Sequence, residues 1–515
     1  MGEILARLRE QGVAAAVLGG LSDLEVYPRS IVSDGRAVLF LGRQGRKRRL
    51  GILENASSEA SAAGFDLTTR TVQIGGQSLL LGLGEASHAN ATALRGRLPF
   101  TAPIRVGLHK SVGLGDRLGI ATPGHIRAVR HAKGIVPVFA QQSIREMERT
   151  ERTPDQVIDT ATWGVFQEGW EAGYGADADH LKTPADIDVC VAAGFVMYTL
   201  DPREHVDNEA ETDSLQTLAV KYEALPWDQL ETTARETQAA YVGKSWDLDA
   251  TYHLTMDREH LLRAACKYGH ALAHLAAMYR HLLSAIGDKP FELEVSVDET
   301  ETPTKPEEHL YIANELKRLG VEWVSLAPRY IGRFEKGVDY IGDLARFEED
   351  FSWHVAIAKA MGPYKLSLHS GSDKFSIYPI AARVAGNLVH LKTAGTSYLE
   401  ALRAIASVDP DLFREILRFA IANYERERVS YHVSGELARV PAVDSLTDEH
   451  LGDVLDQFDA RQVLHVTFGR VLTTKNDHGQ YLFRDRFYDV LEGDEEAHYD
   501  ALETHIAKHV LPFSD

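Results

Sequence analysis

The chain has few cysteines and no long apolar run. Only Cys190 and Cys266 occur among 515 residues, which excludes a disulfide scaffold and a cysteine-rich metal site and suits a reducing cytoplasm. No stretch approaches the roughly 18 consecutive apolar residues of a membrane-spanning helix, and the N-terminal MGEILARLREQG is charged and amphipathic, unlike a signal peptide. The sequence therefore predicts a soluble cytoplasmic protein.

Positive charge is also scarce. Lys and Arg number 55 against 75 Asp and Glu, a net charge of −20, so the average surface repels nucleic acid and anionic membranes. An anionic small substrate would need a local basic pocket. The chain has no P-loop and no GxSxG motif, and the glycines of VGLGDRLG (112–119) miss the GxGxxG spacing, so we expect no nicotinamide cofactor.

What the chain does contain is a repeated strand, polar loop and helix. Residues 1–100 carry short alternating apolar runs between Gly-rich turns and predict a small N-terminal α/β module. From residue 101, eight strand-like runs alternate with helical spacers, which predicts a (β/α)8 barrel over 101–480. The predicted strands are 104–111, 135–143, 173–182, 195–202, 291–300, 321–330, 364–375 and 388–397.

Two further segments complete the predicted architecture. Residues 205–287 are too long for a simple crossover and are expected to form a helical insertion after the fourth strand. Residues 481–515 are predicted to be a C-terminal helical extension that packs on the barrel. The run VLHVTFGRVL (463–472) is also strand-like and is expected either to stand outside the barrel or to shift the strand count by one.

Polar side chains gather where the predicted strands end, and in a barrel these ends meet at one mouth. The period of two places Glu292, Glu294, Ser296 and Asp298 on one face of their strand. Several carboxylates there need a cation, and histidines follow the neighbouring strands at 180, 369 and 390. Imidazoles with carboxylates and no thiolate suit Zn, Mn, Fe, Co or Ni, without choosing among them.

Other features have an ordinary structural explanation. His270 and His274 lie four residues apart, as metal ligands do, but leucines and alanines around them indicate a packed helix face. The basic run GRQGRKRRL (42–50) is more typical of a solvated turn between strands than of a phosphate site.

Seven motifs resemble the tagaturonate/fructuronate epimerase (UxaE) family, also described as tagatose 4-epimerase-like. The likeness runs from about residue 104 to 475, while residues 1–100 resemble nothing we can place, and the pattern departs at His109 and Lys110. The motifs are GDRLGIATPGH (115–125), FAQQSIREMERT (139–150), DTATWGVFQEGW (159–170), GYGADADHLK (173–182), EVSVDETETPT (294–304), LHSGSDKFSIYP (368–379) and HLKTAGTSYLEA (390–401).

The resemblance implies a metal-dependent isomerase that interconverts D-tagaturonate and D-fructuronate, and leaves 4-epimerisation of D-tagatose and D-fructose open. The inverted carbon, C3, is β to the keto group at C5, so one enolisation cannot invert it. Breaking and re-forming the C3–C4 bond by retro-aldol chemistry can, and so can transient oxidation at C3. The sequence favours the retro-aldol route, because ADADHLK and LHSGSDK are similar to strand-end patterns of class II aldolases.

That likeness implies roles for individual residues. His180 and His369 would bind the metal with Glu294 as carboxylate ligand, and His390 is a reserve ligand or a partner of one. Asp179 would be the acid/base, and Asp373 would orient Lys374, carry a second proton or simply form a turn. Residues expected to bind substrate are Gln141, Gln142, Ser143, Asp298, Arg329, Ser370, Ser372, Lys374, Lys392 and Thr393, with Lys374, Lys392 and Arg329 expected to meet its carboxylate.

Two other functions compete with the epimerase. An aldolase or an aldose–ketose isomerase acting on sugar acids would use the same architecture. A non-catalytic sugar-acid binding subunit would have no use for grouped carboxylates and imidazoles. A keto-uronate or ketohexose is the expected partner, with no nucleic acid and no membrane, and a homo-oligomer is left open.

Overall fold

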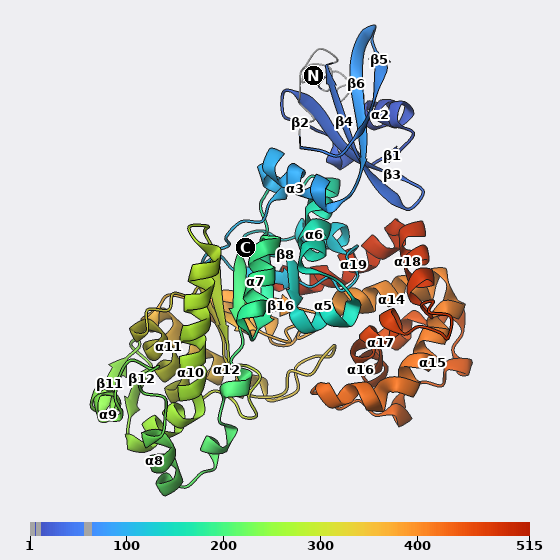
Figure 1. Cartoon of the computed structure of the whole chain (residues 1–515). Coiled ribbons are helices and arrows are strands. Elements are labelled where there is room, and N and C mark those ends of the chain that lie inside the picture. The colour runs from blue at the N-terminus through green and yellow to red at the C-terminus, as the bar shows by residue number, and fades with distance from the viewer. Residues whose placement is uncertain (1–5, 7–11, 56–63) are drawn as a thin grey trace.

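The protein is described here by a computed structural model, which covers residue 6, residues 12–55 and residues 64–515. An N-terminal sheet stands at one end, a barrel lies in the middle, and two helical regions flank the barrel on opposite sides (Figure 1). Most of the amphipathic N-terminal segment MGEILARLREQG lies outside the described residues. Among the described residues, no helix combines the length and the apolar content needed to cross a membrane.

Eight parallel strands close into a barrel, which confirms the predicted fold class. Pairing runs in chain order around the ring, and the last strand pairs with the first. The strands are β7 (Ser111–Leu114), β8 (Val136–Ser143), β9 (Gly175–Leu181), β10 (Met197–Leu200), β13 (Glu292–Ser296), β14 (Ser325–Ala327), β15 (Lys365–Leu368) and β16 (Val389–Thr393).

Two sequence predictions about strands are wrong. The first barrel strand is β7, not 104–111, because Ile104 and Leu108 are exposed whereas Val112 and Leu114 are buried. Gly113 suits this strand because a Cβ there would meet the Gln141 side chain at 2.8 Å. The run 463–472 is helical, in α16 (Phe458–Val466) and α17 (Phe468–Thr473), since a short apolar run buried on all sides does not distinguish strand from helix.

Helices follow the strands and cover the barrel. Ser143 and Thr153 begin α5 and α6 with capping boxes. In each box the side chain of the first residue accepts a hydrogen bond from the backbone amide three residues on, and the side chain of that later residue accepts one from the first residue's amide. The helices are α4 (Thr122–Val129), α5 (Ile144–Thr150), α6 (Pro154–Glu168), α7 (Pro184–Ala193), α10 (Arg258–Ile286), α11 (Pro306–Arg318), α12 (Leu344–Met361), α13 (Tyr378–Ala385) and α14 (Thr396–Val408).

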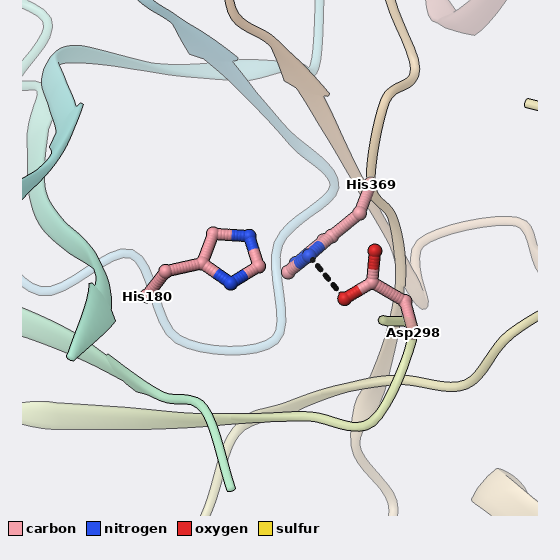
Figure 2. A group of neighbouring side chains, drawn as sticks. All are labelled: His180, Asp298 and His369. Atoms are coloured by element: carbon pink, nitrogen blue, oxygen red, sulfur yellow. Dashed lines mark ion pairs between the residues drawn. The ribbon is translucent and has the colours of Figure 1, made fainter. Parts of the chain in front are cut away.

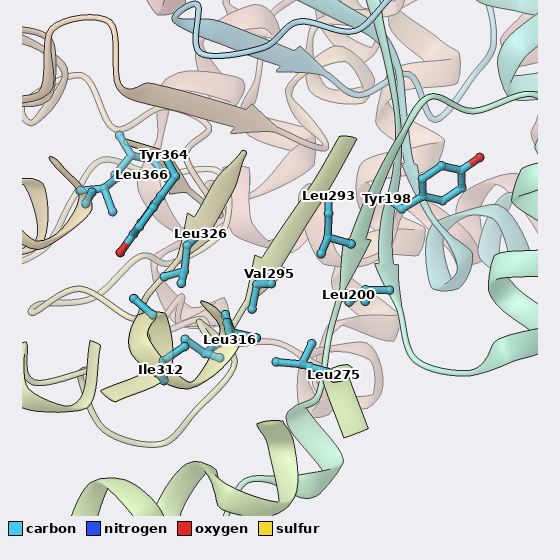
Figure 3. Packing of buried hydrophobic residues seen from close by; sticks show 14 of the residues in the cluster. Tyr198, Leu200, Leu275, Leu293, Val295, Ile312, Leu316, Leu326, Tyr364 and Leu366 are labelled. Atoms are coloured by element: carbon cyan, nitrogen blue, oxygen red, sulfur yellow. The ribbon is translucent and has the colours of Figure 1, made fainter. Parts of the chain in front are cut away.

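The barrel core lies between these helices and the strands. Leu293 and Val295 of β13 are buried beside Leu326 of β14, and Leu316 of α11 packs in the same cluster (Figure 3). Because successive side chains of a strand point to opposite faces, every second residue points into the barrel, where the polar residues of the mouth lie. The packing therefore fixes which side chains of each strand face the barrel interior.

The insertion between β10 and β13 is mainly helical, and it also contains a hairpin that the sequence did not predict. Its elements before α10 are α8 (Leu215–Glu223), α9 (Ala234–Tyr241), β11 (Lys244–Asp247) and β12 (His253–Met256). His270 is exposed, and His274 is hydrogen-bonded to the Lys182 carbonyl at 3.1 Å and stacked on His205. His274 is therefore packed, as the structural explanation expects, whereas His270 lies on the exposed side of the helix.

The N-terminal part is an antiparallel sheet, with α2 (Ala14–Ser22) and α3 (His88–Arg97) beside it. The basic run 42–50 contains the turn between two of its strands, β3 (Ala37–Gln44) and β4 (Lys47–Asn55), as expected. Trp163 and Phe166 of α6 join the second apolar cluster of the sheet and so dock it on the barrel. The strands are β1 (Glu25–Val26), β2 (Val32–Ser33), β3 (Ala37–Gln44), β4 (Lys47–Asn55), β5 (Thr68–Ile74) and β6 (Gln77–Glu85).

The C-terminal helices form a core of their own beside α14. They are α15 (Pro410–Glu427), α16, α17, α18 (Arg484–Gly493) and α19 (Glu495–Val510). The last of them returns to the barrel, where Ile506 and Val510 join the main core. His505 and His509 of α19 reach Asp373 in the loop after β15, whereas Ser514 and Asp515 contact Lys133, just before β8.

Several buried histidines predict that the fold is acid-sensitive. Burial lowers the pKa of His125 and His498 to about 4 and that of His354 to about 3. The unfolded chain therefore binds more protons than the folded one below about pH 6.5. As pH falls from there towards 4, each histidine should remove up to about 1.4 kcal/mol of unfolding free energy per pH unit.

Urea denaturation at pH 7, 6 and 5 measures this slope. In His354→Gln, the unfolding free energy should fall less steeply with decreasing pH, by the contribution of one buried histidine. His478→Gln, at an exposed position, should leave this pH dependence unchanged. Equal slopes in wild type and His354→Gln would contradict the prediction.

Candidate active site at the carboxyl ends of the barrel strands

A buried ammonium holds three carboxylates together inside the barrel. Lys392 Nζ of β16 lies 2.7 Å from Asp177 Oδ2, Asp179 Oδ1 and Glu294 Oε1. It also donates to Thr199 Oγ1 at 2.8 Å. These four partners come from β9, β10 and β13, and all are at most 5% exposed. One cation thus links four strands of the barrel.

The electrostatics of this group follow from its charges. Burial alone would lower the pKa of Lys392, but the three carboxylates outweigh it and raise that pKa well above its usual range. Burial raises the pKa of Asp177 to about 6, because Lys392 offsets it only in part. Asp179 and Glu294 keep lowered pKa values despite burial, since cations and imidazoles surround them. The ionised group carries more negative than positive charge.

Above this group, His180, Asp298 and His369 form a triad of possible metal ligands (Figure 2). One ligand atom from each lies within 4.8 Å of the others. His369 Nδ1 is 3.0 Å from Asp298 Oδ1, and the two imidazole rings meet edge to face with centroids 5.0 Å apart. The three residues follow β9, β13 and β15 or end them, as the strand-end argument predicts.

The second nitrogen of each imidazole is occupied by a carboxylate. Glu294 Oε1 lies 2.7 Å from His369 Nε2, and Asp201 Oδ2 lies 3.0 Å from His180 Nδ1. His369 Nδ1 and His180 Nε2 remain to face the centre of the triad. A carboxylate behind a ligating histidine is the usual arrangement in metal sites, because it fixes the tautomer and the ring orientation. The donor set therefore fits a divalent cation.

The local field favours positive charge at this position. Burial alone would lower the pKa of both imidazoles, but neighbouring carboxylates raise that of His180 to about 10 and that of His369 to about 9. The pKa of Asp298 falls far below its usual range despite burial, chiefly through His369. His180 and Ser370 also have positive φ, 51° and 50°. Such backbone strain is concentrated at functional sites.

Two predicted metal ligands lie close to the triad without completing it. Glu294 contacts Lys392 and His369 as described. His390 lies deeper, with Nδ1 2.8 Å from Ser111 Oγ, and burial lowers its pKa to about 3. Its Nε2 has no hydrogen-bond partner among the described residues. Asp298, expected to bind substrate, occupies the carboxylate position of the triad.

Asp373 and Lys374 point away from the triad. Lys374 Nζ donates to the carbonyls of Glu335, Val338 and Ser372, which uses all three of its N–H donors. Asp373 Oδ1 lies 2.9 Å from Arg461 NH2 and 2.6 Å from His505 Nε2.

Asp373, His505 and His509 are a second group with metal-ligand spacing. Arg461 already neutralises Asp373 in this group. The Asp373 amide also donates to His509 Nε2 at 2.9 Å. These contacts make the group a buried link between the β15 loop, α16 and α19.

The remaining predicted residues line the mouth or support it. Gln141 Nε2 donates to Asp179 Oδ2 at 3.2 Å, whereas Ser143 caps α5. Ser372 and Thr393 donate to backbone carbonyls at 3.2 and 2.8 Å. Gln142 is buried, and Arg329 and Ser370 line the cleft.

A cleft of about 490 Å³ opens over the triad. Asp298, His369 and Ser370 form part of its wall, and the segment 429–434 after α15 closes one side. The cleft is also lined by four cations that were not predicted from the sequence, because the strand pattern does not single them out: Arg145, Arg203, Arg333 and Lys336. Arg145 alone had a signal, because it follows the end of β8 by two residues.

The fold and the site define a class of protein, a (β/α)8-barrel enzyme with a buried carboxylate–imidazole centre. The model of the UxaE family, tagaturonate epimerase, matches residues 27–512. A tagaturonate/fructuronate epimerase from Thermotoga maritima is 45% identical over 426 residues, 83% of this chain and 85% of the relative. The crystal structure of the fructuronate-tagaturonate epimerase UxaE from Cohnella laeviribosi superposes with a TM-score of 0.88 at 38% identity, over 98% of this chain and 99% of that chain.

The chain belongs to the UxaE family of tagaturonate epimerases and is an isomerase. The matched region reaches into the first 100 residues, which the motifs alone did not connect with the family.

The Lys392 group predicts a large stability effect. In Lys392→Met, three buried carboxylates lose their cation, which should cost about 3–5 kcal/mol of unfolding free energy. The measurement is urea denaturation at pH 7 with a chelator present, so that no metal replaces the ammonium. Lys365→Met is the matched control, because Lys365 is equally buried but donates to Ser111 Oγ and has no carboxylate in ion-pair contact among the described residues. Equal losses in both variants would contradict the prediction.

Proposed function

We propose that the chain interconverts D-tagaturonate and D-fructuronate by retro-aldol and aldol steps at a divalent cation held by His180, Asp298 and His369. The observation that carries this proposal is the triad, whose two imidazoles each direct one nitrogen towards its centre and are held at the other nitrogen by a carboxylate. A bound cation would supply a Lewis acid that polarises the keto group. Metal analysis of the purified protein identifies the cation.

Asp179 is the proposed base for the hydroxyl at C3. Its lowered pKa keeps it ionised, so it can accept the hydroxyl proton. As the proton leaves, a carbonyl forms at C3 and the electron pair of the C3–C4 bond moves to C4, conjugated with the C5 keto group. The C3 aldehyde then presents its other face, C4 attacks it, and Asp179 returns the proton to oxygen. No oxidant is consumed.

The other site residues support these steps. Lys392 holds Asp179 Oδ1 and Gln141 holds Oδ2, so the carboxylate is fixed in position. Glu294 orients His369 and does not transfer protons in this scheme. Asp373 fixes the β15 loop through Arg461 and His505.

An aldolase would release the two halves that an epimerase recombines. The cleft walls formed by 429–434 and the β14 loop favour retention of both halves. The free, buried Cys190 and Cys266 suit a cytoplasmic location.

The first prediction concerns the metal. Exhaustive chelation should abolish turnover, and a divalent ion should restore it. His180→Ala, His369→Ala and Asp298→Ala should each lose the metal from the purified protein, while Glu294→Ala should weaken binding by roughly 10- to 100-fold, as loss of a supporting carboxylate does. Metal analysis by mass spectrometry checks this, with His432→Ala at an exposed position of the cleft wall as the control that keeps its metal. Full occupancy in the triad variants would overturn the assignment.

The second prediction concerns the bond that breaks. Turnover in D₂O should leave the hydrogen at C3 unexchanged, because that C–H bond stays intact in a retro-aldol reaction. Product analysis by NMR measures the exchange. Solvent deuterium at C3 would show proton abstraction there and would end the retro-aldol proposal, whatever the metal analysis gives.

A further inference from the structure

Among the described residues that line the cleft over the triad, Lys336 and Arg329 are the cations without a carboxylate in ion-pair contact, and Lys336 is the ammonium of the two. Arg203 and Arg145 both lie near Glu299, at 2.6 and 3.6 Å, and Arg333 lies 3.5 Å from Glu335. Lys336 Nζ donates to Ser370 Oγ at 2.7 Å. Within the described part of the chain, no carboxylate lies in ion-pair contact with Lys336.

The position of Lys336 relates it to the reacting centre. Its hydroxyl partner Ser370 directly follows His369 of the triad, and both line the same cleft as Lys336. The lysine side chain is partly buried. Burial and the nearby Arg145 lower the pKa of Lys336. An ammonium that is poorly compensated and partly desolvated gains most from an anion brought by a ligand.

We infer that Lys336 binds the carboxylate of the sugar acid and so determines the preference for uronates over neutral ketohexoses. This inference rests on the keto-uronate activity of the family and is independent of the metal. The carboxylate is C1 and the keto group C5 of one six-carbon chain, so the two ends can reach neighbouring sites in a single cleft.

The cations expected from the sequence compete poorly for this role. Lys392 is surrounded by three carboxylates, and Lys374 donates to three carbonyls. Arg329 lines the cleft, and burial lowers its pKa. Asp298 of the triad is close enough to offset part of this shift, so Arg329 can assist. Its guanidinium, however, has no side-chain hydrogen bond among the described residues, whereas Lys336 is tied to Ser370, next to His369.

Kinetics of charge variants test the inference. Lys336→Met should lower kcat/KM for D-tagaturonate by roughly 10- to 100-fold, the value of a hydrogen bond to a charged group, mainly through KM. Lys336→Arg keeps the charge and should recover most of the loss. The inhibition constant of D-fructose, a neutral competitor, should change less than about threefold in both variants. Lys317→Met, at an exposed lysine of α11 outside the cleft, is the matched control and should behave as wild type.

Two further measurements separate rival explanations. Ser370→Ala removes the hydroxyl partner but not the charge, so it should leave the discrimination between uronate and neutral sugar largely intact if Lys336 acts directly. Metal content should stay at the wild-type level in Lys336→Met, which distinguishes this inference from failure of the metal proposal. Lys336→Gln replaces Lys336→Met if the latter does not fold.

An equal loss of affinity for D-tagaturonate and D-fructose in Lys336→Met would overturn the inference, as would unchanged uronate kinetics. A Lys336→Arg variant as impaired as Lys336→Met would also overturn it, because position and not charge would then be responsible.

Discussion

The ion group around Lys392 is the constraint on which the barrel mouth depends. Asp177 and Asp179 of β9 and Glu294 of β13 are buried on either side of β10, so each would repel the others without a cation between them. The single ammonium cancels only part of their charge. The remaining negative potential extends to the imidazoles above it, whose pKa values rise to about 9 and 10. One charge balance therefore stabilises the strand ends and makes the triad attractive to a divalent cation.

The loop that carries His369 is held from far away in the chain. Ser370 and Asp373 both adopt positive φ, which costs free energy that neighbouring contacts must offset. Arg461 of α16 and His505 of α19 supply these contacts through Asp373. The C-terminal helices thus do more than cover the barrel, because they fix the geometry of a loop that forms one wall of the cleft.

These contacts explain what the sequence could and could not predict. Strand periodicity and polar strand ends identified the barrel, and they brought His180, Glu294 and His369 to one mouth. They could not tell that Lys374 turns to backbone carbonyls, because side-chain direction in a loop depends on tertiary contacts. Lys336 was missed because it lies in the long segment after β14, where no period marks an inward face. The run 463–472 was wrongly predicted to be a strand, because a short apolar run of this kind also occurs in buried helices.

The retro-aldol route depends on where the cleft holds the substrate's carboxylate relative to its reacting carbons. Breaking C3–C4 leaves a three-carbon aldehyde that still carries the carboxylate, and inversion requires rotation about its C2–C3 bond. A carboxylate held at Lys336 would keep this half in the cleft while C3 turns, whereas a loosely held half would diffuse away and the enzyme would act as an aldolase. Anchoring the carboxylate, beyond its contribution to affinity, therefore separates epimerisation from cleavage, and places that distinction in the cleft wall and not in the triad.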